Sequence, residues 1–322
     1  MVASRNRLSP DLPERVGAFL ADRFGSLSRI DVGLSGGIDS VVLLHLLRRV
    51  SRLPVRAIHV HHGLSPNADG WAVFCQDFCH SLRVDLTICH VSVDRSQGDG
   101  LEAAARNARY GAFAGLQLDG IFLAQHRGDQ AETVLLNLLR GTGLIGLAAM
   151  PQERTRGDLR ILRPLLDTGR DEIEAYARCE GLQWIEDESN ADCRLTRNFI
   201  RHKVLLGLQA RFPNTEQVLA GTAGHLAESV LLLDELAASD WLAVSMEHAL
   251  PMTEVRRMAP IRLKNVLRWR LRNLGWQVPV ATRLEEFTRQ LLTAGTDRHP
   301  ALELPQGRMF VAKGALRWAA GK

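Results

Sequence analysis

Short apolar runs alternate with amphipathic stretches from Ile30 to about residue 180, and this alternation constrains the fold of the chain more than any other feature. The short runs have the length of buried strands, while the longer stretches have the period of helices. This order is typical of βαβ units that build a parallel sheet with helices on its faces. The sequence therefore predicts an α/β fold with a Rossmann-like parallel sheet. The predicted strands are residues 30–34, 55–60, 86–91, 121–125 and 159–162, and the predicted helices are 41–49, 71–82, 101–116, 130–140 and 170–180.

The strand pattern stops near residue 200, where long helical stretches take over. The turn-forming cluster Phe212-Pro213-Asn214 breaks the pattern between the two regions. A length of 322 residues suits about two domains. We therefore predict one domain over residues 1–212 and a smaller, mainly helical domain over residues 213–322, with a small hairpin at 301–319.

The charged residues exclude some phosphate and imine chemistry. The chain has 40 Lys and Arg against 36 Asp and Glu, a formal charge of +4. No lysine precedes Lys203, so the first two hundred residues hold neither a Walker-A lysine nor a Schiff-base lysine. Residues 1–210 have 25 basic and 25 acidic side chains, so the positive surplus lies in residues 211–322. The predominance of arginine can also reflect genomic composition alone.

The apolar segments give no indication of a membrane protein. No apolar run approaches the ~20 residues of a membrane-spanning helix, and the N-terminus lacks the apolar core of a signal peptide. Five cysteines, an odd number, show no spacing typical of a disulfide framework. We therefore expect a cytoplasmic protein with reduced thiols and no membrane partner.

A glycine-rich loop separates the first predicted strand from the first predicted helix. Such a loop points backbone N–H groups and the positive end of a helix dipole at one place, which suits a phosphate or pyrophosphate. A carboxylate beside a polyphosphate would repel it, so Asp39 is best explained as a Mg²⁺ ligand. An ordinary turn with a capping Asp or Ser is the alternative. The predicted phosphate-binding residues are Ser35, Gly36, Gly37, Ile38, Asp39 and Ser40.

A second glycine pattern, Gly141-x-Gly143-x-x-Gly146, nominally matches a dinucleotide-binding fingerprint. It follows a predicted helix rather than a strand, which is the wrong context for that motif. We predict a loop at this position.

The loop at residues 35–40 resembles the SGGxDS signature of the N-type ATP pyrophosphatases, the PP-loop superfamily, whose members cleave ATP between the α and β phosphates. Other segments resemble one family within it, the tRNA(Ile)-lysidine synthases. The resemblance is dense over residues 30–212 and thinner beyond. The segments are His59-Val60-His61-His62-Gly63-Leu64, Glu102 to Arg106 with Arg109-Tyr110, His126 to Thr133 with Arg140 to Gly143, and Arg163 to Leu166 through Trp184 to Arg201.

This resemblance implies ATP and Mg²⁺ as cofactors, with free L-lysine and the isoleucine tRNA of anticodon CAU as substrates. In that family ATP activates the C2 carbonyl of the cytidine at the first anticodon position, and the lysine amine then displaces AMP. The product base is lysidine. The resemblance makes residues 1–212 the ATP-pyrophosphatase domain and residues 213–322 a domain for tRNA and substrate binding.

Charged residues near the fourth predicted strand are the candidates for lysine binding. Asp129 and Glu132 lie three residues apart at a helix start, so both can face the carboxyl edge of the sheet. We predict that they bind the lysine amine, Mg²⁺ or both, with Asp39, Asp129 and His126 as catalytic residues and Asp39 with Glu132 as metal ligands. The resemblance indicates Arg106 and Arg197 as the clamp on the lysine carboxylate. A surface or packing ion pair is the alternative for each arginine.

Histidines follow two of the predicted strands. We predict that His126 orients the adenylate or acts as an acid or base, and a core histidine is the alternative. His59 and His61 would share one face of a strand, but no Cys or carboxylate completes a zinc site. We therefore predict that His59 and His62 line the nucleotide pocket.

Two positions depart from the pattern of the family. Gly128 replaces the first of two adjacent acids, which removes one possible ligand for a metal or amine and leaves open how Asp129 and Glu132 divide their roles. Leu206 stands where proline is usual shortly after Arg201, which affects helix stiffness more than chemistry.

Residues 256–274 contain seven basic side chains and no acid. Lys264, Arg268 and Arg272 recur every four residues, which predicts one basic stripe opposite an apolar helix face. We predict that this stripe contacts tRNA phosphates, and a solvated helix face is the alternative. Larger members of the family have a further C-terminal domain that holds the acceptor stem, and we expect this chain to stop before it.

Two other functions remain open from the residues alone. A tRNA thiolation enzyme of the same superfamily would need cysteines at the site, whereas Cys75 and Cys79 have the i, i+4 spacing of core thiols on a helix. A tRNA-binding protein that has lost catalysis is the second alternative, and Gly128 is the only indication of it.

Overall fold

The computed structural model describes residues 11–93, 101–246, 248–295 and 298–321. The chain divides into two compact units, an N-terminal unit of residues 1–225 and a C-terminal unit of residues 226–322. The division falls inside the long helix α10 (Thr215–Val244), which begins directly after the turn at residues 212–214. None of the described helices is long and apolar enough to cross a membrane.

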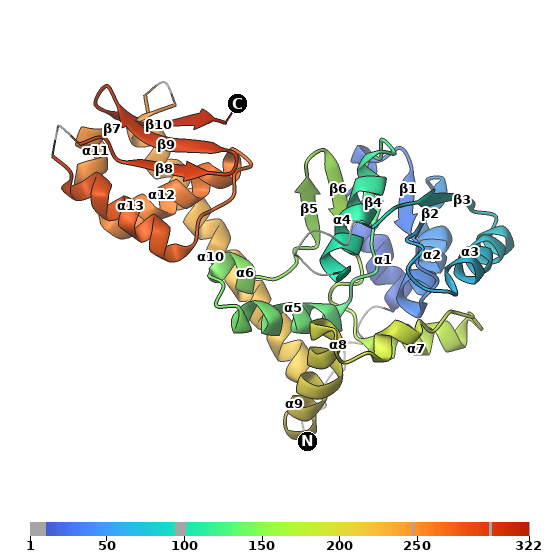
Figure 1. Ribbon diagram of the computed structural model, residues 1–322. Coiled ribbons are helices and arrows are strands. Elements are labelled where there is room, and N and C mark those ends of the chain that lie inside the picture. Colours follow the sequence, from blue (N-terminus) through green and yellow to red (C-terminus); the bar gives the residue numbers. More distant parts are fainter. Residues whose placement is uncertain (1–10, 94–100, 247, 296–297, 322) are drawn as a thin grey trace, which may run out of the picture. The chain divides into compact units, whose positions relative to one another are not determined.

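The N-terminal unit contains the predicted sheet (Figure 1). Neighbouring strands are parallel from β3 to β6, as predicted, whereas β5 is antiparallel to β6. The sequence pattern missed β5 because an exposed edge strand needs no apolar side chains, and its residues are Glu-Arg-Thr-Arg. The chain order reverses between β1 and β4, which is where such sheets bind ligands. In spatial order the described strands are β3 (Asp85–His90), β2 (Val55–His61), β1 (Ile30–Gly33), β4 (Ile121–Phe122), β6 (Leu159–Leu162) and β5 (Glu153–Arg156).

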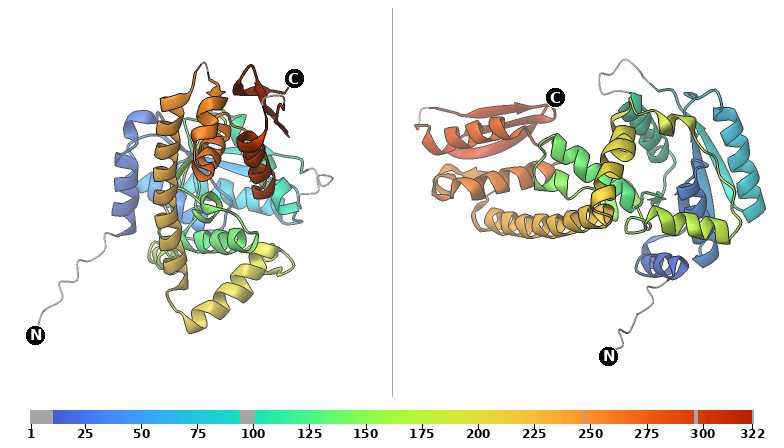
Figure 2. Two further views of the ribbon diagram at one scale, coloured as in Figure 1. Left: turned by 90° about the vertical axis from the view of Figure 1, so that its left-hand side faces the viewer. Right: turned by 90° about the horizontal axis from the view of Figure 1, so that it is seen from below.

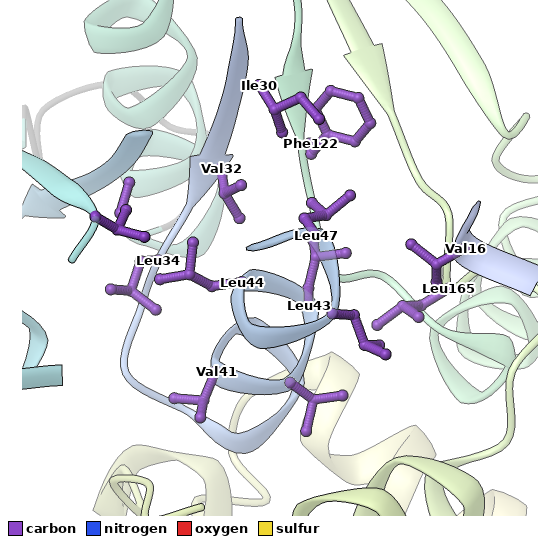
Figure 3. Packing of buried hydrophobic residues seen from close by; sticks show 14 of the residues in the cluster. Val16, Ile30, Val32, Leu34, Val41, Leu43, Leu44, Leu47, Phe122 and Leu165 are labelled. Carbon is purple, nitrogen blue, oxygen red and sulfur yellow. The ribbon is translucent and has the colours of Figure 1, made fainter. Parts of the chain in front are cut away.

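Helices cover both faces of this sheet. On one face the apolar run of α2 is buried, and Leu44 and Leu47 pack with Ile30, Val32 and Phe122 of the sheet (Figure 3). On the other face, α4 (Leu101–Ala114) packs against the sheet through a second apolar cluster that includes Tyr110 and Phe113. The helices on the first face are α1 (Leu12–Ala21), α2 (Ile38–Val50), α3 (Ala68–Leu82) and α7 (Arg170–Cys179).

Helices beyond the carboxyl edge of the sheet share a smaller core. Ala131 of α5 packs there with Ile200 and Leu205 of a π-helix, η3. Gly141 and Gly143 lie in the predicted loop between α5 and α6, whereas Gly146 lies within α6. These elements are α5 (Arg127–Leu139), α6 (Leu144–Leu147), α8 (Thr196–Phe199), η3 (Ile200–Leu205) and α9 (Leu206–Arg211), and the short 3₁₀ turns of the unit are η1 (Phe24–Ser26) and η2 (Glu188–Ala191).

The C-terminal unit is mainly helical, as predicted, but it has more strand than the expected hairpin. Its described strands form an antiparallel sheet in the order β7, β10, β9 and β8. Helices α12 and α13 lie against this sheet (Figure 2). Leu263 and Leu267 of α12 share a buried core with Phe287 of α13 and Met309 of the sheet. The elements are the second part of α10, then α11 (Met252–Arg257), α12 (Pro260–Asn273), α13 (Ala281–Thr293), β7 (Leu250–Pro251), β8 (Ala301–Leu304), β9 (Gly307–Ala312) and β10 (Ala315–Ala320).

Candidate functional site

The glycine-rich loop connects β1 to α2, as the sequence predicts. Gly37 is the N-cap of α2 and has no side chain to cap it, so the first backbone N–H groups of the helix are available to an anion. The hydroxyls of Ser35 and Ser40 lie 3.1 Å apart, and Ser40 Oγ donates to the Gly37 carbonyl at 2.9 Å. The loop therefore has a fixed shape with donors on its open side.

Gly36 is held against a distant part of the chain. Its φ of +89° is a left-handed conformation, and a Cβ on Gly36 would lie 2.6 Å from Cδ1 of Ile185. The Ile185 N–H donates to the Gly36 carbonyl at 2.9 Å. Only glycine fits this contact, which places the segment around Trp184 and Glu186 beside the loop.

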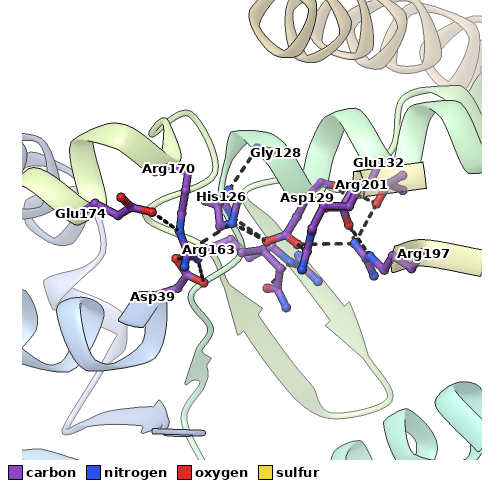
Figure 4. A network of polar contacts seen from close by, with 12 residues as sticks. Asp39, His126, Gly128, Asp129, Glu132, Arg163, Arg170, Glu174, Arg197 and Arg201 are labelled. Atoms are coloured by element: carbon purple, nitrogen blue, oxygen red, sulfur yellow. Dashed lines mark hydrogen bonds and ion pairs between the residues drawn. The ribbon is translucent and has the colours of Figure 1, made fainter. Parts of the chain in front are cut away.

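Asp39 lies in the first turn of α2 and is paired with an arginine that the sequence did not indicate. Nη1 of Arg170, at the start of α7, donates to both Asp39 carboxylate oxygens at 2.7 and 2.6 Å (Figure 4). Burial raises the pKa of Asp39, and the nearby carboxylate of Asp129 adds to this, while His126 and Arg170 oppose it. A partly buried carboxylate of this kind favours a cationic partner.

His126 is the N-cap of α5 and is 6% exposed. Its Nδ1 accepts from the Gly128 N–H at 3.1 Å, which places the ring proton on Nε2. That Nε2 lies 3.9 Å from Asp39 Oδ1 and 3.7 Å from Asp129 Oδ2. A Cβ on Gly128 would lie 2.8 Å from Cε1 of His126, so the absence of a side chain at position 128 is what lets the imidazole cap the helix.

Asp129 and Glu132 face the same place, as the helix spacing predicts. Asp129 Oδ2 accepts from the His126 backbone N–H at 3.0 Å, which completes the cap of α5. Burial acts to raise the pKa of Asp129, but His126, Arg197, Arg201 and that hydrogen bond together lower it. Asp129 is therefore held as a carboxylate, the form that can bind an ammonium group.

Glu132 is 2% exposed and joins two arginines. Arg197 Nε donates to Oε2 at 2.8 Å and Arg201 Nε to Oε1 at 2.5 Å. Both guanidinium groups also lie 3.7 and 3.5 Å from Asp129 Oδ1 (Figure 4). Two carboxylates and two arginines thus form one network that starts at His126.

The structure places Arg106 elsewhere. Its guanidinium lies 5.6 Å from the centre of the Tyr110 ring, on the side of α4. No contact between the described residues joins Arg106 to Arg197. The predicted clamp of these two arginines on a carboxylate therefore stays a prediction, because a ligand would have to bridge the two groups.

The two histidines predicted for a nucleotide pocket have different surroundings. His59 is 4% exposed, and its Nδ1 donates to the Leu34 carbonyl at 2.9 Å, just before the glycine-rich loop. His62 Nδ1 is buried without a hydrogen-bond partner among the described residues. Burial, with Arg109 and the neighbouring histidines, lowers the pKa of His62 to about 4, so this ring is neutral at pH 7.

The basic stripe of the C-terminal unit lies on α12, opposite a buried apolar face. Acids from neighbouring helices reach two of its members, because Lys264 Nζ lies 3.3 Å from Glu285 Oε1 and Arg272 pairs with Asp234. These pairs reduce the charge that Lys264 and Arg272 offer to an anion. The predicted contact with tRNA remains untested.

Sequence reasoning did not assign Arg170, Arg201 or Thr133 to the site. Arg201 had a usable signal, since it lies four residues after Arg197 and shares its helix face. Thr133 accepts from Arg197 Nη2 at 3.3 Å and directly follows Glu132. Arg170 had no such signal, because only the packing of α7 beside α2 brings it to Asp39.

A cation fits Asp39 better than Glu132. Asp39 is partly exposed beside the uncapped start of α2 and the serine hydroxyls, so a Mg²⁺ held there could also reach the oxygens of a bound phosphate. Its carboxylate accepts from the half-exposed Arg170, which a bound cation would displace. Glu132 already accepts from two guanidinium groups. No contact among the described residues joins Asp39 to Glu132, and His126 with Asp129 lies between them (Figure 4).

Known protein families and individual proteins are similar to this chain. Residues 8–208 match the model of the PP-loop domain family, and residues 250–321 match the TilS substrate binding domain. The chain is 44% identical to the tRNA(Ile)-lysidine synthase of Nitrosomonas europaea over 277 residues, which cover 84% of this chain and 60% of that protein. It is 43% identical to the tRNA(Ile)-lysidine synthase of Pseudomonas putida over 305 residues, 90% of this chain and 70% of that protein.

A solved structure shares the fold. The tRNA thiolase NcsA from Methanococcus maripaludis, with its 4Fe-4S cluster, matches with a TM-score of 0.57 at 18% identity, over 67% of this chain and 78% of that chain. At this identity the match supports the architecture of the N-terminal unit and no more.

Proposed function

Because the chain belongs to the tRNA(Ile)-lysidine synthase family, we propose that it ligates free L-lysine to C2 of cytidine 34 of the CAU-anticodon tRNA(Ile), with release of AMP and diphosphate. The chain spans 60% of the Nitrosomonas europaea protein and 73% of its relative from Pseudomonas fluorescens. The activity of the whole protein is therefore part of the proposal. We place the reaction in the cytoplasm, where free tRNA, ATP and lysine occur together.

One observation carries the proposal. A continuous series of polar contacts runs from Asp39 at the phosphate loop through His126 to Asp129 and Glu132, and it ends on Arg197 and Arg201. This series joins the loop that we propose for a polyphosphate to the carboxylates that we propose for a charged amine. A lysine ligase that uses ATP needs both sites within reach of one reacting carbon.

The first step forms an adenylated cytidine. The C2 carbonyl oxygen attacks the α phosphorus, the bond to the β-phosphate bridging oxygen breaks, and diphosphate leaves. The amides at the start of α2 and the hydroxyls of Ser35 and Ser40 would bind the phosphates. Asp39 would hold Mg²⁺, which neutralises charge on the phosphates when bound. Neutral His62, near the end of β2, would face the nucleotide without repelling a cation.

The second step joins lysine to the base. The lysine nitrogen adds to C2, the bond between C2 and the adenylate oxygen breaks, AMP leaves, and the nitrogen loses a proton. Asp129, held as a carboxylate, would bind the ammonium group, and Arg106 and Arg197 would bind the lysine carboxylate. The Nε2–H of His126 lies between Asp39 and Asp129, where it can donate its proton to the oxygen of the departing AMP.

The thiolation alternative is not favoured. Cys75 and Cys79 are buried, and burial raises the pKa of both thiols to about 12, so neither is a thiolate near pH 7. Cys75 Sγ instead packs 3.5 Å from His59 Nδ1 beneath the phosphate loop. The cysteines thus support the loop from the core.

The deciding experiment supplies the purified chain with ATP, Mg²⁺, radiolabelled lysine and a CAU-anticodon tRNA transcript. We expect labelled lysine to become bound to tRNA with an equal amount of AMP released. A transcript with a CAU anticodon from the methionine tRNA and a transcript with a UAU anticodon serve as controls. A folded protein that binds ATP but never attaches lysine to the tRNA would contradict the proposal.

Replacing Gly128 by alanine should lower the rate of AMP release about 10- to 100-fold, because the new Cβ displaces the His126 ring from its capping position. Stability should change by less than about 1 kcal/mol, since alanine favours the helix by about as much as the cap is worth. Gly70→Ala is the matched control, because Gly70 also lies in the first turn of a helix and its Cβ meets nothing within 4 Å. Equal rates in the two variants would remove His126 from the chemistry.

A further inference from the structure

Arginines gather around Tyr110 on the α4 face of the sheet. We define the arginine cluster as Arg106 and Arg109 of α4, Arg154 and Arg156 of β5, and Arg163 directly after β6. The guanidinium of Arg156 lies 4.8 Å from the centre of the Tyr110 ring, and its Nη2 donates to Asn107 Oδ1 at 3.2 Å. An aromatic face and a side-chain oxygen thus hold this exposed arginine in place.

Four members of the cluster have no acidic partner in the part of the chain that the structure describes. Among the described residues, no carboxylate forms an ion pair with Arg106, Arg154, Arg156 or Arg163. On the opposite face of the same strand, Glu153 pairs with both Arg23 and Arg160. Because successive residues of a strand point to opposite faces, Glu153 and its two arginines balance their charges on the α1 side of β5, whereas Arg154 and Arg156 point to the α4 side, where no described carboxylate pairs with them.

Arg163 adds a buried positive charge to the cluster. It is only 2% exposed, and its guanidinium donates to uncharged oxygens, Nε to Gln125 Oε1 at 3.1 Å and Nη1 to the Pro151 carbonyl at 2.9 Å. Burial lowers the pKa of Arg163. A buried cation without a carboxylate is costly, and an anion bound at the exposed members of the cluster would reduce that cost.

The cluster borders the candidate site. Gln125, which accepts from Arg163, immediately precedes His126, and Arg163 lies beside His126 in Figure 4. Arg154 and Arg156 project from the same face of the edge strand, with Cα atoms about 6.6 Å apart. A row of exposed guanidinium groups suits a chain of phosphates better than one small anion.

We propose that Arg154 and Arg156, the exposed edge-strand members of the arginine cluster, bind the phosphates of the tRNA strand next to the cytidine that reacts, while Arg106 stays with the lysine carboxylate as proposed above. This inference rests on the proposed function for the identity of the RNA. The phosphates of ATP belong to the loop at α2, and one lysine carboxylate needs no row of arginines. The polyanion that must reach this edge of the sheet is the anticodon strand.

The test compares Arg154→Ala/Arg156→Ala with a matched double variant, Arg52→Ala/Arg178→Ala, which removes two exposed arginines elsewhere on the N-terminal unit. Fluorescence anisotropy gives the Kd of each full chain for labelled CAU tRNA and for its isolated anticodon stem-loop between 50 and 200 mM KCl. We expect the first variant to bind both RNAs on the order of tenfold more weakly, with a salt slope shallower by about 0.7 per lost phosphate contact. The control should bind like the wild type.

Further measurements separate the possible causes. Arg154→Lys/Arg156→Lys should restore most of the affinity, because lysine keeps the charge, and the Kd for ATP should stay at the wild-type value in all variants. Unchanged RNA affinity and salt slope in the alanine variant would overturn the inference, as would a loss confined to the full tRNA or a loss of lysine binding alone. Failure of lysine transfer by the wild type would instead contradict the proposed function, and RNA binding would still report on the cluster.

Discussion

Asp39→Asn should reduce AMP release on the order of 10³-fold, because asparagine keeps the shape of the side chain but cannot offer a charged oxygen to Mg²⁺. The contact with Arg170 should survive in part, since the amide oxygen still accepts. The loss should therefore appear in the rate rather than in the fold. ATP/pyrophosphate exchange measures it directly, and the Mg²⁺ concentration for half-maximal rate should rise.

Asp69→Asn is the control for this variant. Asp69 also lies in the first turn of a helix that follows a strand of the sheet, and it pairs with His61 at an exposed position. The Asp69→Asn variant therefore removes the same interaction of a carboxylate with a helix dipole and leaves the phosphate loop unchanged. An Asp39→Asn enzyme with the exchange rate of the Asp69→Asn enzyme would exclude a metal role for Asp39.

Glu132→Gln should lower the free energy of unfolding by about 3 kcal/mol, since it leaves two arginines facing a buried amide. For a unit of this size the expected decrease in Tm is about 6–12 °C. Because Arg197 and Arg201 lose the carboxylate that holds them, the KM for lysine should rise as well. Thermal melts and lysine saturation curves measure the two effects.

Glu174→Gln is the matched control, because Glu174 also accepts from two arginines, Arg170 and Arg178. These pairs lie at the surface with i, i+4 spacing, so each contributes only about 0.3–0.5 kcal/mol. Similar decreases in Tm for the two variants would show that the Glu132 network is no more than another set of surface ion pairs.

Much of the N-terminal unit could be predicted from local pattern. The strand, loop and helix around Ser35 to Ser40 follow from apolar periodicity and glycine content, and the shared face of Asp129 and Glu132 follows from helix geometry. Both features depend on residues close in sequence. The strand β5 was not predicted, because its polar side chains give no indication of burial.

The contacts that complete the site depend on packing between distant elements. The pairing of Arg170 with Asp39 spans 131 positions, and nothing near either residue indicates the other. The acids that meet Lys264 and Arg272 likewise come from other helices, although residues 256–274 contain none. Gly128 looked like a lost ligand in the sequence, whereas the structure shows that its missing side chain makes room for a histidine cap.

The hydrogen bond between the Ile185 N–H and the Gly36 carbonyl has a consequence for biosynthesis. The phosphate loop ends at residue 40, but Ile185, which holds Gly36 in place, is synthesised much later. A nascent chain that has already folded β1, α2 and β2 therefore still lacks the contact that fixes Gly36. The loop takes its final form only after α5 with Asp129 and α7 with Arg170 have been synthesised.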